Sequence, residues 1–297
     1  MKANKITVIK IGGAGLGDAT RFKLFATEIL PTIESEQKII VCSAIKHVTH
    51  HLVEIFEVRK NILLLNEKFD NFYNAHLRII ARLGACSKIL ESFDLHYAQL
   101  KETLALTNEE SMYAELLQYG ERISSMMLSL ELKYYGIENT LFDARDYIKT
   151  LGDSYKDTLI DHFVSEKLIH EGIPELLDSS NLLITQGFIS RKSSTGENSI
   201  LPLNGSDTSA AFFAHSVRAS KMIFLKDVPG ICMNYAHSEI DFNNIKANIS
   251  FEDYFRRFEN EKVYPVHPSA ISILAYRKIP TRVCSFLYPS LHGTEIN

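Results

Sequence analysis

The sequence lacks an apolar run long enough to cross a bilayer, because no uninterrupted stretch of about 18 apolar residues occurs in it. Its first apolar run, residues 6–11, contains Lys10 and is followed directly by glycines. A secretory signal needs a longer uncharged run and a small-residue cleavage site. We therefore expect no membrane association and no secretory leader, and we predict a cytoplasmic location.

Cysteine and surplus charge are also scarce. The four cysteines are scattered without a C-x-x-C pair, which favours reduced, mostly buried thiols over a disulfide framework or a structural zinc site. The 32 basic and 36 acidic residues leave a net charge of only −4, so the chain has no electrostatic footprint for nucleic acid or an anionic membrane. With 45% apolar and 23% charged residues, the composition is typical of a globular protein and not of a disordered one.

The sequence does contain an alternation of strand-like and helix-like segments. Residues 6–11 and 38–44 predict two buried strands, and residues 18–30 between them predict a helix, which together make a right-handed parallel crossover. The polar segment 191–199 predicts a loop or hairpin tip. Further segments follow the same alternation, with strands expected at 182–189, 221–225 and 281–286, and helices near 157–170, 208–217 and 269–277.

A largely helical region interrupts this alternation. Apolar residues recur every three or four positions within residues 52–101, which predicts amphipathic helices. A second helical block begins near residue 108 and ends at Gly136, in a C-cap position. The whole pattern indicates an α/β protein with a mainly parallel sheet covered on both faces. No break in composition marks a linker, so we expect one compact unit with two lobes.

The clearest candidate for chemistry is Lys10 with Gly12 and Gly13. Glycine lets backbone N–H groups approach phosphate oxygens, and lysine supplies a point charge for a phosphoryl group. The run is not a Walker A loop, because no G-K-[ST] ends it, and Asp18 replaces the last glycine of G-x-G-x-x-G. This spacing argues against a nicotinamide-dependent dehydrogenase. A simple tight turn from strand to helix is the alternative.

Hydroxyl groups follow the second predicted strand. Ser43 and Thr49 lie beyond its carboxyl end, where open α/β sheets bind ligands. The histidines within residues 47–51 and the nearby Glu54 match no recognised ligand spacing, so we interpret them as surface residues and expect no metal site there.

Three further segments carry weaker signals. Glu121, beside Gly120 at what we expect to be a helix entrance, either holds a substrate ammonium group or forms a solvated pair with Arg122. Asp207 begins a predicted helix, either within a simple N-cap or facing anionic ligands and lysines. Residues 226–230 form an Asp-x-x-Gly turn after a strand, which is common in proteins.

Taken in order, these segments resemble the catalytic domain of aspartate kinases, within the amino acid kinase superfamily. Residues 10–13 (KIGG) resemble the opening K-F-G-G of that family, residues 43–49 its S-A-x-x-x-V-T and residues 120–125 its G-E-R-L-S-S. The later matches keep the order of the family, with D-A-R at 143–145, G-F-I at 187–189, G-S-D at 205–207, H-P at 267–268 and I-P-x-R-V at 279–283.

The resemblance implies a single amino acid kinase domain over residues 1–297, a three-layer α/β/α sandwich with an acceptor lobe (1–207) and a nucleotide lobe (208–297). It implies transfer of the γ-phosphoryl group of ATP, with Mg²⁺, to a carboxylate of an amino acid, with aspartate the leading candidate. Lys10 and Asp207 would be catalytic. The other implied roles are nucleotide binding by Gly12, Gly13, Lys226, Asp227, Gly230 and Lys262, and substrate binding by Ser43, Thr49, Glu121 and Ser206.

The sequence also departs from the family pattern. Leu203 stands where the family carries an arginine that pairs a substrate carboxylate, so either the substrate is a different amino acid or acid, or another cation such as Lys46 or Arg191 compensates. Lys226 replaces a threonine, the family's A-D-P-R is not visible around residues 234–237, and Lys262 is one residue out of register.

Two expectations about the assembled protein follow from the same resemblance. The altered nucleotide segment leaves open a non-catalytic homologue that binds a ligand or a partner. The resemblance further implies a homodimer, and it implies no feedback control through regulatory domains, because no such segment follows the catalytic motifs.

Overall fold

The computed structural model describes residues 6–231, 245–288 and 292–297, and its centre is a mainly parallel sheet of eight strands. Strand β1 (Ile6–Ile11) lies in the middle of this sheet and is buried along its whole length, as expected for a parallel strand covered on both faces. From one edge of the sheet to the other, the strand order is β10 (Asn248–Ile249), β12 (Thr294–Ile296), β11 (Thr281–Ser285), β9 (Lys221–Lys226), β1, β2 (Gln37–Cys42), β6 (Leu182–Gln186) and β3 (Thr140–Leu141).

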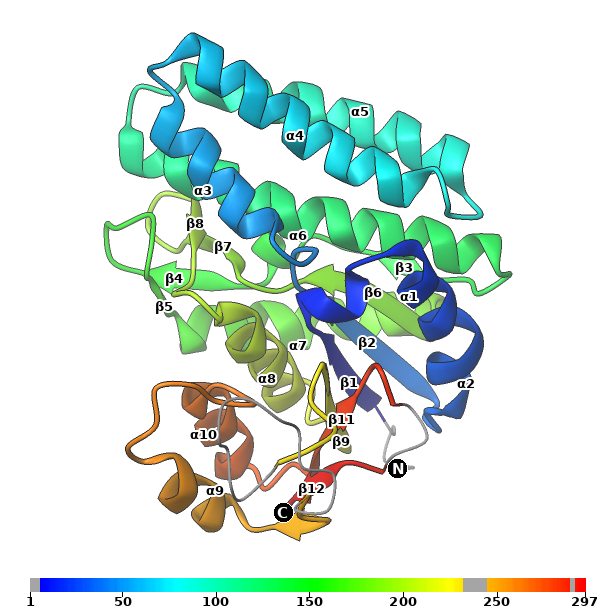
Figure 1. Cartoon of the computed structure of the whole chain (residues 1–297). Helices are drawn as coiled ribbons and strands as arrows, with labels where there is room; N and C mark the ends of the chain where they lie inside the picture. The colour runs from blue at the N-terminus through cyan, green and yellow to red at the C-terminus, as the bar shows by residue number, and fades with distance from the viewer. Residues whose placement is uncertain (1–5, 232–244, 289–291) are drawn as a thin grey trace.

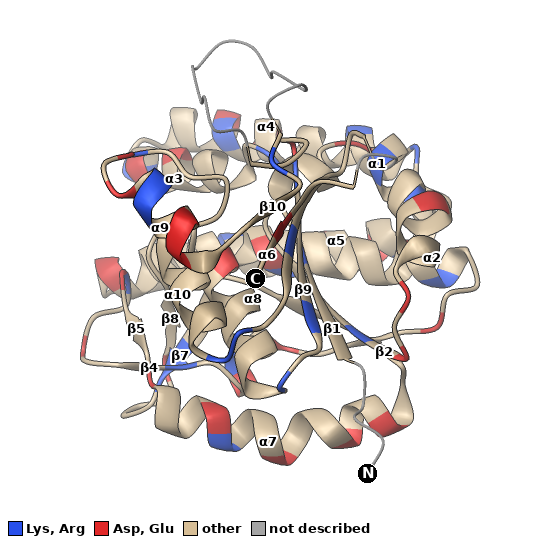
Figure 2. Ribbon diagram, turned by 90° about the horizontal axis from the view of Figure 1, so that it is seen from below, with Lys and Arg blue, Asp and Glu red and all other residues tan. Residues whose placement is uncertain are grey.

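Helices cover both faces of the sheet. On one face the long helix α6 (Glu109–Tyr134) packs against β2, β3 and β6, and α3, α4 and α5 lie outside it (Figure 1). On the other face α8 (Gly205–Ser216) packs against β1, β2 and β9, with α7 and α10 beside it (Figure 2). The expected three-layer α/β/α sandwich is therefore confirmed. The remaining bounds are α3 (Val48–Val58), α4 (Ile62–Ile80), α5 (Cys86–Glu102), α7 (His162–Ser179), α9 (Phe251–Phe258) and α10 (Pro268–Tyr276).

The strand expected at residues 182–189 is divided in two, which corrects the sequence prediction. Phe188 has a positive φ of 67°, and this left-handed residue turns the chain out of the main sheet. The chain continues as β7 (Ile189–Lys192), in a second, four-stranded sheet. Its other strands are β5 (Leu159–Ile160), β4 (Lys149–Leu151) and β8 (Asn198–Ile200), and the predicted hairpin tip lies between β7 and β8.

Helix boundaries also differ from the expectation. The helix predicted near residues 157–170 begins only at His162, because Asp161 caps it and the residues before it form β5. The helix predicted over residues 18–30 is interrupted: α1 (Ala19–Leu24) passes into a π-helical turn (Phe25–Ile29) and then into α2 (Leu30–Thr32).

None of the helices in the described residues has the length and apolar character needed to span a membrane. Of the cysteines that the structure describes, Cys42 is buried and Cys86 and Cys284 are half-buried, and all three are free thiols.

Candidate active site

The carboxyl ends of β1, β2 and β9 meet at a cavity of about 400 Å³. Because these strands are parallel neighbours, residues far apart in the sequence arrive at the same edge of the sheet. Helices α3, α6 and α8 supply the rest of the wall. The residues that line the cavity are Lys10, Gly13, Ser43, Ala44, Thr49, Glu121, Phe188, Leu203, Asn204, Ser206, Asp207 and Lys226.

Two lysines converge on one carboxylate in this cavity. The Nζ atom of Lys10 lies 2.8 Å from Oδ1 of Asp207, and Nζ of Lys226 donates to both carboxylate oxygens, at 2.9 and 2.7 Å. The backbone N–H of His267 donates to Oδ2 of Asp207 at 3.3 Å. Lys10 and Asp207 are buried, so the three side chains form a rigid ionic group inside the protein.

The electrostatics of this group set its protonation. Burial alone would raise the pKa of Asp207, but the positive charges of Lys10 and Lys226 outweigh it and hold that pKa far below its usual range. Burial lowers the pKa of Lys226 to about 8; the charge of Asp207 opposes this shift and that of Lys10 adds to it. Asp207 is therefore an anion at neutral pH whose oxygens are occupied by cations, which makes it a positioning group and a poor proton acceptor.

The two glycines after β1 act differently from each other. The backbone N–H of Gly12 donates to the carbonyl of Leu225 at 3.1 Å, so it is not available to a phosphate as the sequence reading assumed. A Cβ on Gly12 would lie 3.7 Å from Nζ of Lys10, which is an ordinary van der Waals distance, so packing does not require a glycine there. Gly13 is pressed against the loop after β2, since a Cβ there would come within 2.5 Å of the carbonyl oxygen of Ala44.

Glu121 is buried in the middle of α6, not at a helix entrance, and it is not a solvated partner of Arg122. Gly120 allows this placement, because a Cβ there would lie 2.8 Å from Cβ of Ala44. Burial raises the pKa of Glu121 to about 8, against the opposing effect of nearby backbone N–H groups and the charge of Lys10. Within the described residues Oε2 of Glu121 has no hydrogen-bond partner. Glu121 also lines the cavity, and a buried carboxyl oxygen without a partner can accept a hydrogen bond from a ligand.

The other predicted acceptor residues also reach the cavity. Ser43, Thr49 and Ser206 line it, in agreement with their positions after β2 and at the start of α3 and α8. Neither Ser206 nor Asp207 caps α8; its N-cap is Asn204, at a φ of 70° and without a side-chain bond.

Sequence reasoning missed three participants. Phe188 and Asn204 line the cavity through left-handed backbone positions, and His267 holds Asp207 through its backbone. The Gly-Phe-Ile and His-Pro motifs were the available signals for Phe188 and His267, but neither motif says that its backbone points into a site.

Four of the predicted nucleotide-binding residues, Gly12 among them, do not line the cavity. Asp227 and Lys262 are exposed, whereas Gly230 is buried and a Cβ on it would come within 2.8 Å of Thr294 Oγ1. Residues 234–237, where the family's A-D-P-R is not visible, lie outside the described residues. Across the described ranges no group of three or more histidine, cysteine or acidic side chains is arranged to hold a metal ion.

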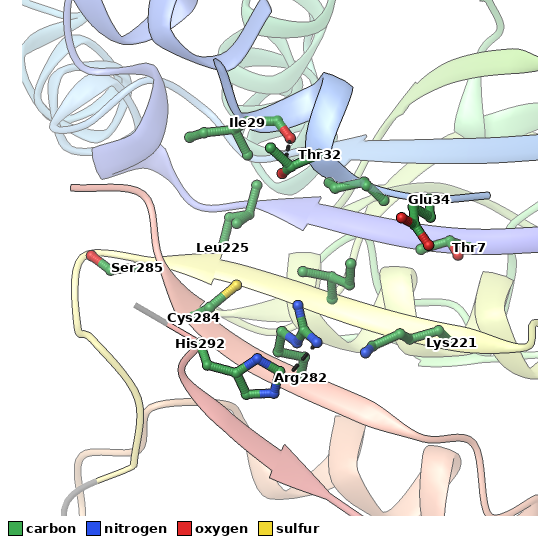
Figure 3. Close-up of a pocket in the computed structure, with 12 residues that line it drawn as sticks. Thr7, Ile29, Thr32, Glu34, Lys221, Leu225, Arg282, Cys284, Ser285 and His292 are labelled. Atoms are coloured by element: carbon green, nitrogen blue, oxygen red, sulfur yellow. Dashed lines mark hydrogen bonds between the residues drawn. The ribbon is translucent and has the colours of Figure 1, made fainter. Parts of the chain in front are cut away.

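A second cavity, of about 350 Å³, lies against β1, β9 and β11 and the end of α2 (Figure 3). Beside this cavity the carboxylate of Glu295 contacts two cations and a histidine: its Oε1 lies 3.0 Å from Nζ of Lys221, 2.6 Å from Nε of Arg282 and 3.3 Å from Nε2 of His292. Lys221 and Lys226 are the two ends of β9, so one strand contributes to both clusters.

Comparison with known proteins identifies the family. The chain matches the profile of the Amino acid kinase family over residues 5–285. It is 28% identical to the lysine-sensitive aspartokinase 3 of Escherichia coli, over 77% of this chain and 50% of that protein, and 24% identical to the bifunctional aspartokinase/homoserine dehydrogenase of Buchnera aphidicola, over 92% of this chain and 34% of that protein. The chain thus spans half or less of the length of these two relatives.

Solved structures agree with the sequence matches. Escherichia coli aspartokinase III, in complex with lysine and aspartate, superimposes with a TM-score of 0.84 at 25% identity, covering 98% of this chain and 64% of that one. Its complex with aspartate and ADP gives a TM-score of 0.82 at the same identity and the same coverage. The resemblance indicated by the sequence motifs is confirmed, and the chain belongs to the amino acid kinase family.

Proposed function

We propose that this protein transfers the γ-phosphoryl group of ATP to a carboxylate of a small amino acid and releases an acyl phosphate and ADP. The observation that carries the proposal is the joining of Lys10, Asp207 and Lys226 in one cavity with the buried Glu121. Cations for phosphates and a carboxyl for an ammonium group then face the same space. The ligands named for the Escherichia coli structures, aspartate and ADP, support the same pairing of substrates.

The chemistry requires little more than position and charge. An oxygen of the acceptor carboxylate attacks the γ-phosphorus, a new P–O bond forms, and the bond to the β-phosphate oxygen breaks as ADP leaves. A carboxylate has no proton to lose, so this reaction needs no general base, which suits a site whose Asp207 is neutralised by two lysines. Lys10 and Lys226 would contact the phosphates and stabilise the charge that moves onto the leaving oxygen.

The described residues suit a nucleotide that brings its own metal ion. In the part of the chain that the structure describes, no group of three or more histidine, cysteine or acidic side chains is arranged to hold Mg²⁺, and both oxygens of Asp207 already accept from lysines. When bound on the nucleotide phosphates, Mg²⁺ would supply further neutralisation of their charge. Gly13 and Lys10 both line the cavity in which the phosphates would lie.

The acceptor has two candidates within this function. Aspartate is the acceptor that the names of the relatives indicate. A different amino acid or acid derivative is favoured by Leu203, an uncharged side chain on the cavity wall. A homodimer and a cytoplasmic location remain predictions from the resemblance.

Trapping with hydroxylamine tests the proposal, because hydroxylamine converts an acyl phosphate into a hydroxamate. The protein, ATP and Mg²⁺ are incubated with a panel of amino acids, and hydroxamate and ADP are measured together. We expect both products in equal amounts with at least one amino acid, and neither from Lys10→Met. ADP without hydroxamate would contradict a carboxyl acceptor. Binding of an ATP analogue with no turnover of any acceptor would instead support a non-catalytic homologue.

A further inference from the structure

The charged groups of the active-site cavity are few. Within residues 6–231, 245–288 and 292–297, the ionisable side chains that line it are Lys10, Lys226, Asp207 and Glu121. Both lysines are bonded to Asp207, and the proposed function directs what remains of their charge toward nucleotide phosphates. The cavity therefore has no cation beyond the two lysines that are paired with Asp207 and that the proposed function assigns to the nucleotide.

Glu121 provides for one substrate charge of the opposite sign. Its side chain is buried, its Oε2 atom has no partner within the described residues, and burial raises its pKa. An ammonium group beside that oxygen would supply both the missing donor and the missing charge. Ser43 and Thr49, on the same wall, add hydroxyl groups but no charge.

The wall near the start of α8 offers a second carboxylate no cation within the described residues, only neutral donors such as the amide of Asn204. Leu203 and Phe188 stand there beside Asn204, and none of these side chains carries a charge. Neither of the two cations expected to compensate lines the cavity: Lys46 is exposed, and Arg191 donates to Asp146 at 2.6 Å and to Asn198 at 3.3 Å. A carboxylate placed against Leu203 would meet no cation on that wall within the described residues, so it would lack the charge-assisted partner that favours a bound carboxylate.

We infer that the acceptor is an amino acid with one carboxylate and one ammonium group, and that Leu203 selects against a second carboxylate. The inference rests on the proposed function and chooses between its two candidate acceptors. The carboxylate that accepts the phosphoryl group lies toward Lys10, the ammonium group pairs with Glu121, and the uncharged remainder of the substrate packs toward Leu203. Acceptors built like aspartate without a charged α-carboxylate meet this description.

Three acceptors that differ only in the disputed group provide the test. Aspartate carries the α-carboxylate, isoasparagine carries a neutral amide in its place, and β-alanine has only hydrogen there. All three keep a carboxylate and an ammonium group two carbons apart. For the unmodified protein we expect kcat/KM, measured by hydroxamate and ADP formation, to be at least ~10-fold higher for the better of the two uncharged compounds than for aspartate, mainly through KM.

Substitution at position 203 makes the test specific. Leu203→Arg adds a cation at an exposed position, so we expect folding to be retained and kcat/KM for aspartate to rise about 10-fold, the size of a charge-assisted hydrogen bond. The matched variant Leu203→Met, which adds no charge, should keep the ranking of the three acceptors. Preference of the unmodified protein for aspartate, or no gain for aspartate in Leu203→Arg, would overturn the inference and leave the proposed function intact. Absence of hydroxamate from every carboxylate would overturn both.

Discussion

The structure contains two clusters in which one carboxylate gathers several cations, and they differ in burial and in their place on the sheet. Asp207 is 5% exposed and holds Lys10 and Lys226 at the carboxyl ends of parallel strands. Glu295 is 14% exposed, but its partners Lys221 and Arg282 are each 29% exposed. Lys221 lies at the amino end of β9, the same strand that carries Lys226 at its carboxyl end.

This difference separates a reactive group from a surface network. Charges removed from water interact strongly, cost much to desolvate and can act on a ligand that also leaves water. Charges that keep water are screened and contribute little. The same combination of lysine and carboxylate is therefore suited to the proposed chemistry at one end of β9 and to a modest structural role at the other. Each of the following experiments compares the two clusters.

The largest difference should appear in catalysis. Lys10→Met removes a cation that we place on the transferring phosphoryl group, so we expect kcat to fall by about 10³-fold. Lys221→Met removes a cation of the second cluster and should change kcat less than about twofold. Steady-state kinetics on both variants checks this, and equal losses would remove the functional distinction between the clusters.

The next difference should appear in stability. Asp207→Asn leaves two lysines without their buried counter-charge, and we expect the free energy of unfolding to fall by about 3–5 kcal/mol. Glu295→Gln, with partners that remain hydrated, should cost only about 1 kcal/mol. Urea denaturation of the two variants measures both costs. A cost for Glu295→Gln as large as that for Asp207→Asn would contradict the role assigned to burial.

The pH dependence of nucleotide binding should sharpen the comparison further. Lys226, with a pKa near 8, is charged below that pH and loses its charge above it, so affinity for an ATP analogue should fall about tenfold by pH 9. Lys226→Arg stays charged over this range and should bind without that fall, although its geometry differs. The matched change Lys221→Arg should leave the profile of the unmodified protein unaltered. Calorimetry at several pH values provides the measurement.

The smallest effect concerns salt. The ion pair between Arg282 and Glu295 is partly hydrated, so a double-mutant cycle should give a coupling of about 0.5 kcal/mol at low salt that largely vanishes at 1 M salt. A coupling that persists at 1 M would mean that this cluster is as shielded as the first. Because neither partner lines the active-site cavity, stability and not activity is the quantity to follow.

Much of the candidate site could be predicted because its residues follow strands. Lys10 and Lys226 belong to runs of apolar residues that form parallel neighbours of one sheet, so their carboxyl ends had to meet. The turn that carries Asp207 was visible as a glycine before a helix. Glu121 could not be placed in this way, because its burial depends on how closely α6 approaches the loop after β2 at Gly120. The sequence predicts that Gly12 binds phosphate, but its N–H donates to the carbonyl of Leu225. This hydrogen bond joins segments more than 200 residues apart in the chain.

The amino-acid sequence by itself determined the α/β alternation, the parallel sheet and the ordered motifs, because these depend on local periodicity and on residues near one another in the chain. Only the tertiary structure decided which charges are buried together, which carboxyl oxygen is left without a partner, and that an uncharged wall at Leu203 faces the cavity. The physical reason is that desolvation and pairing are properties of a place in space, and the sequence states the residues but not their neighbours.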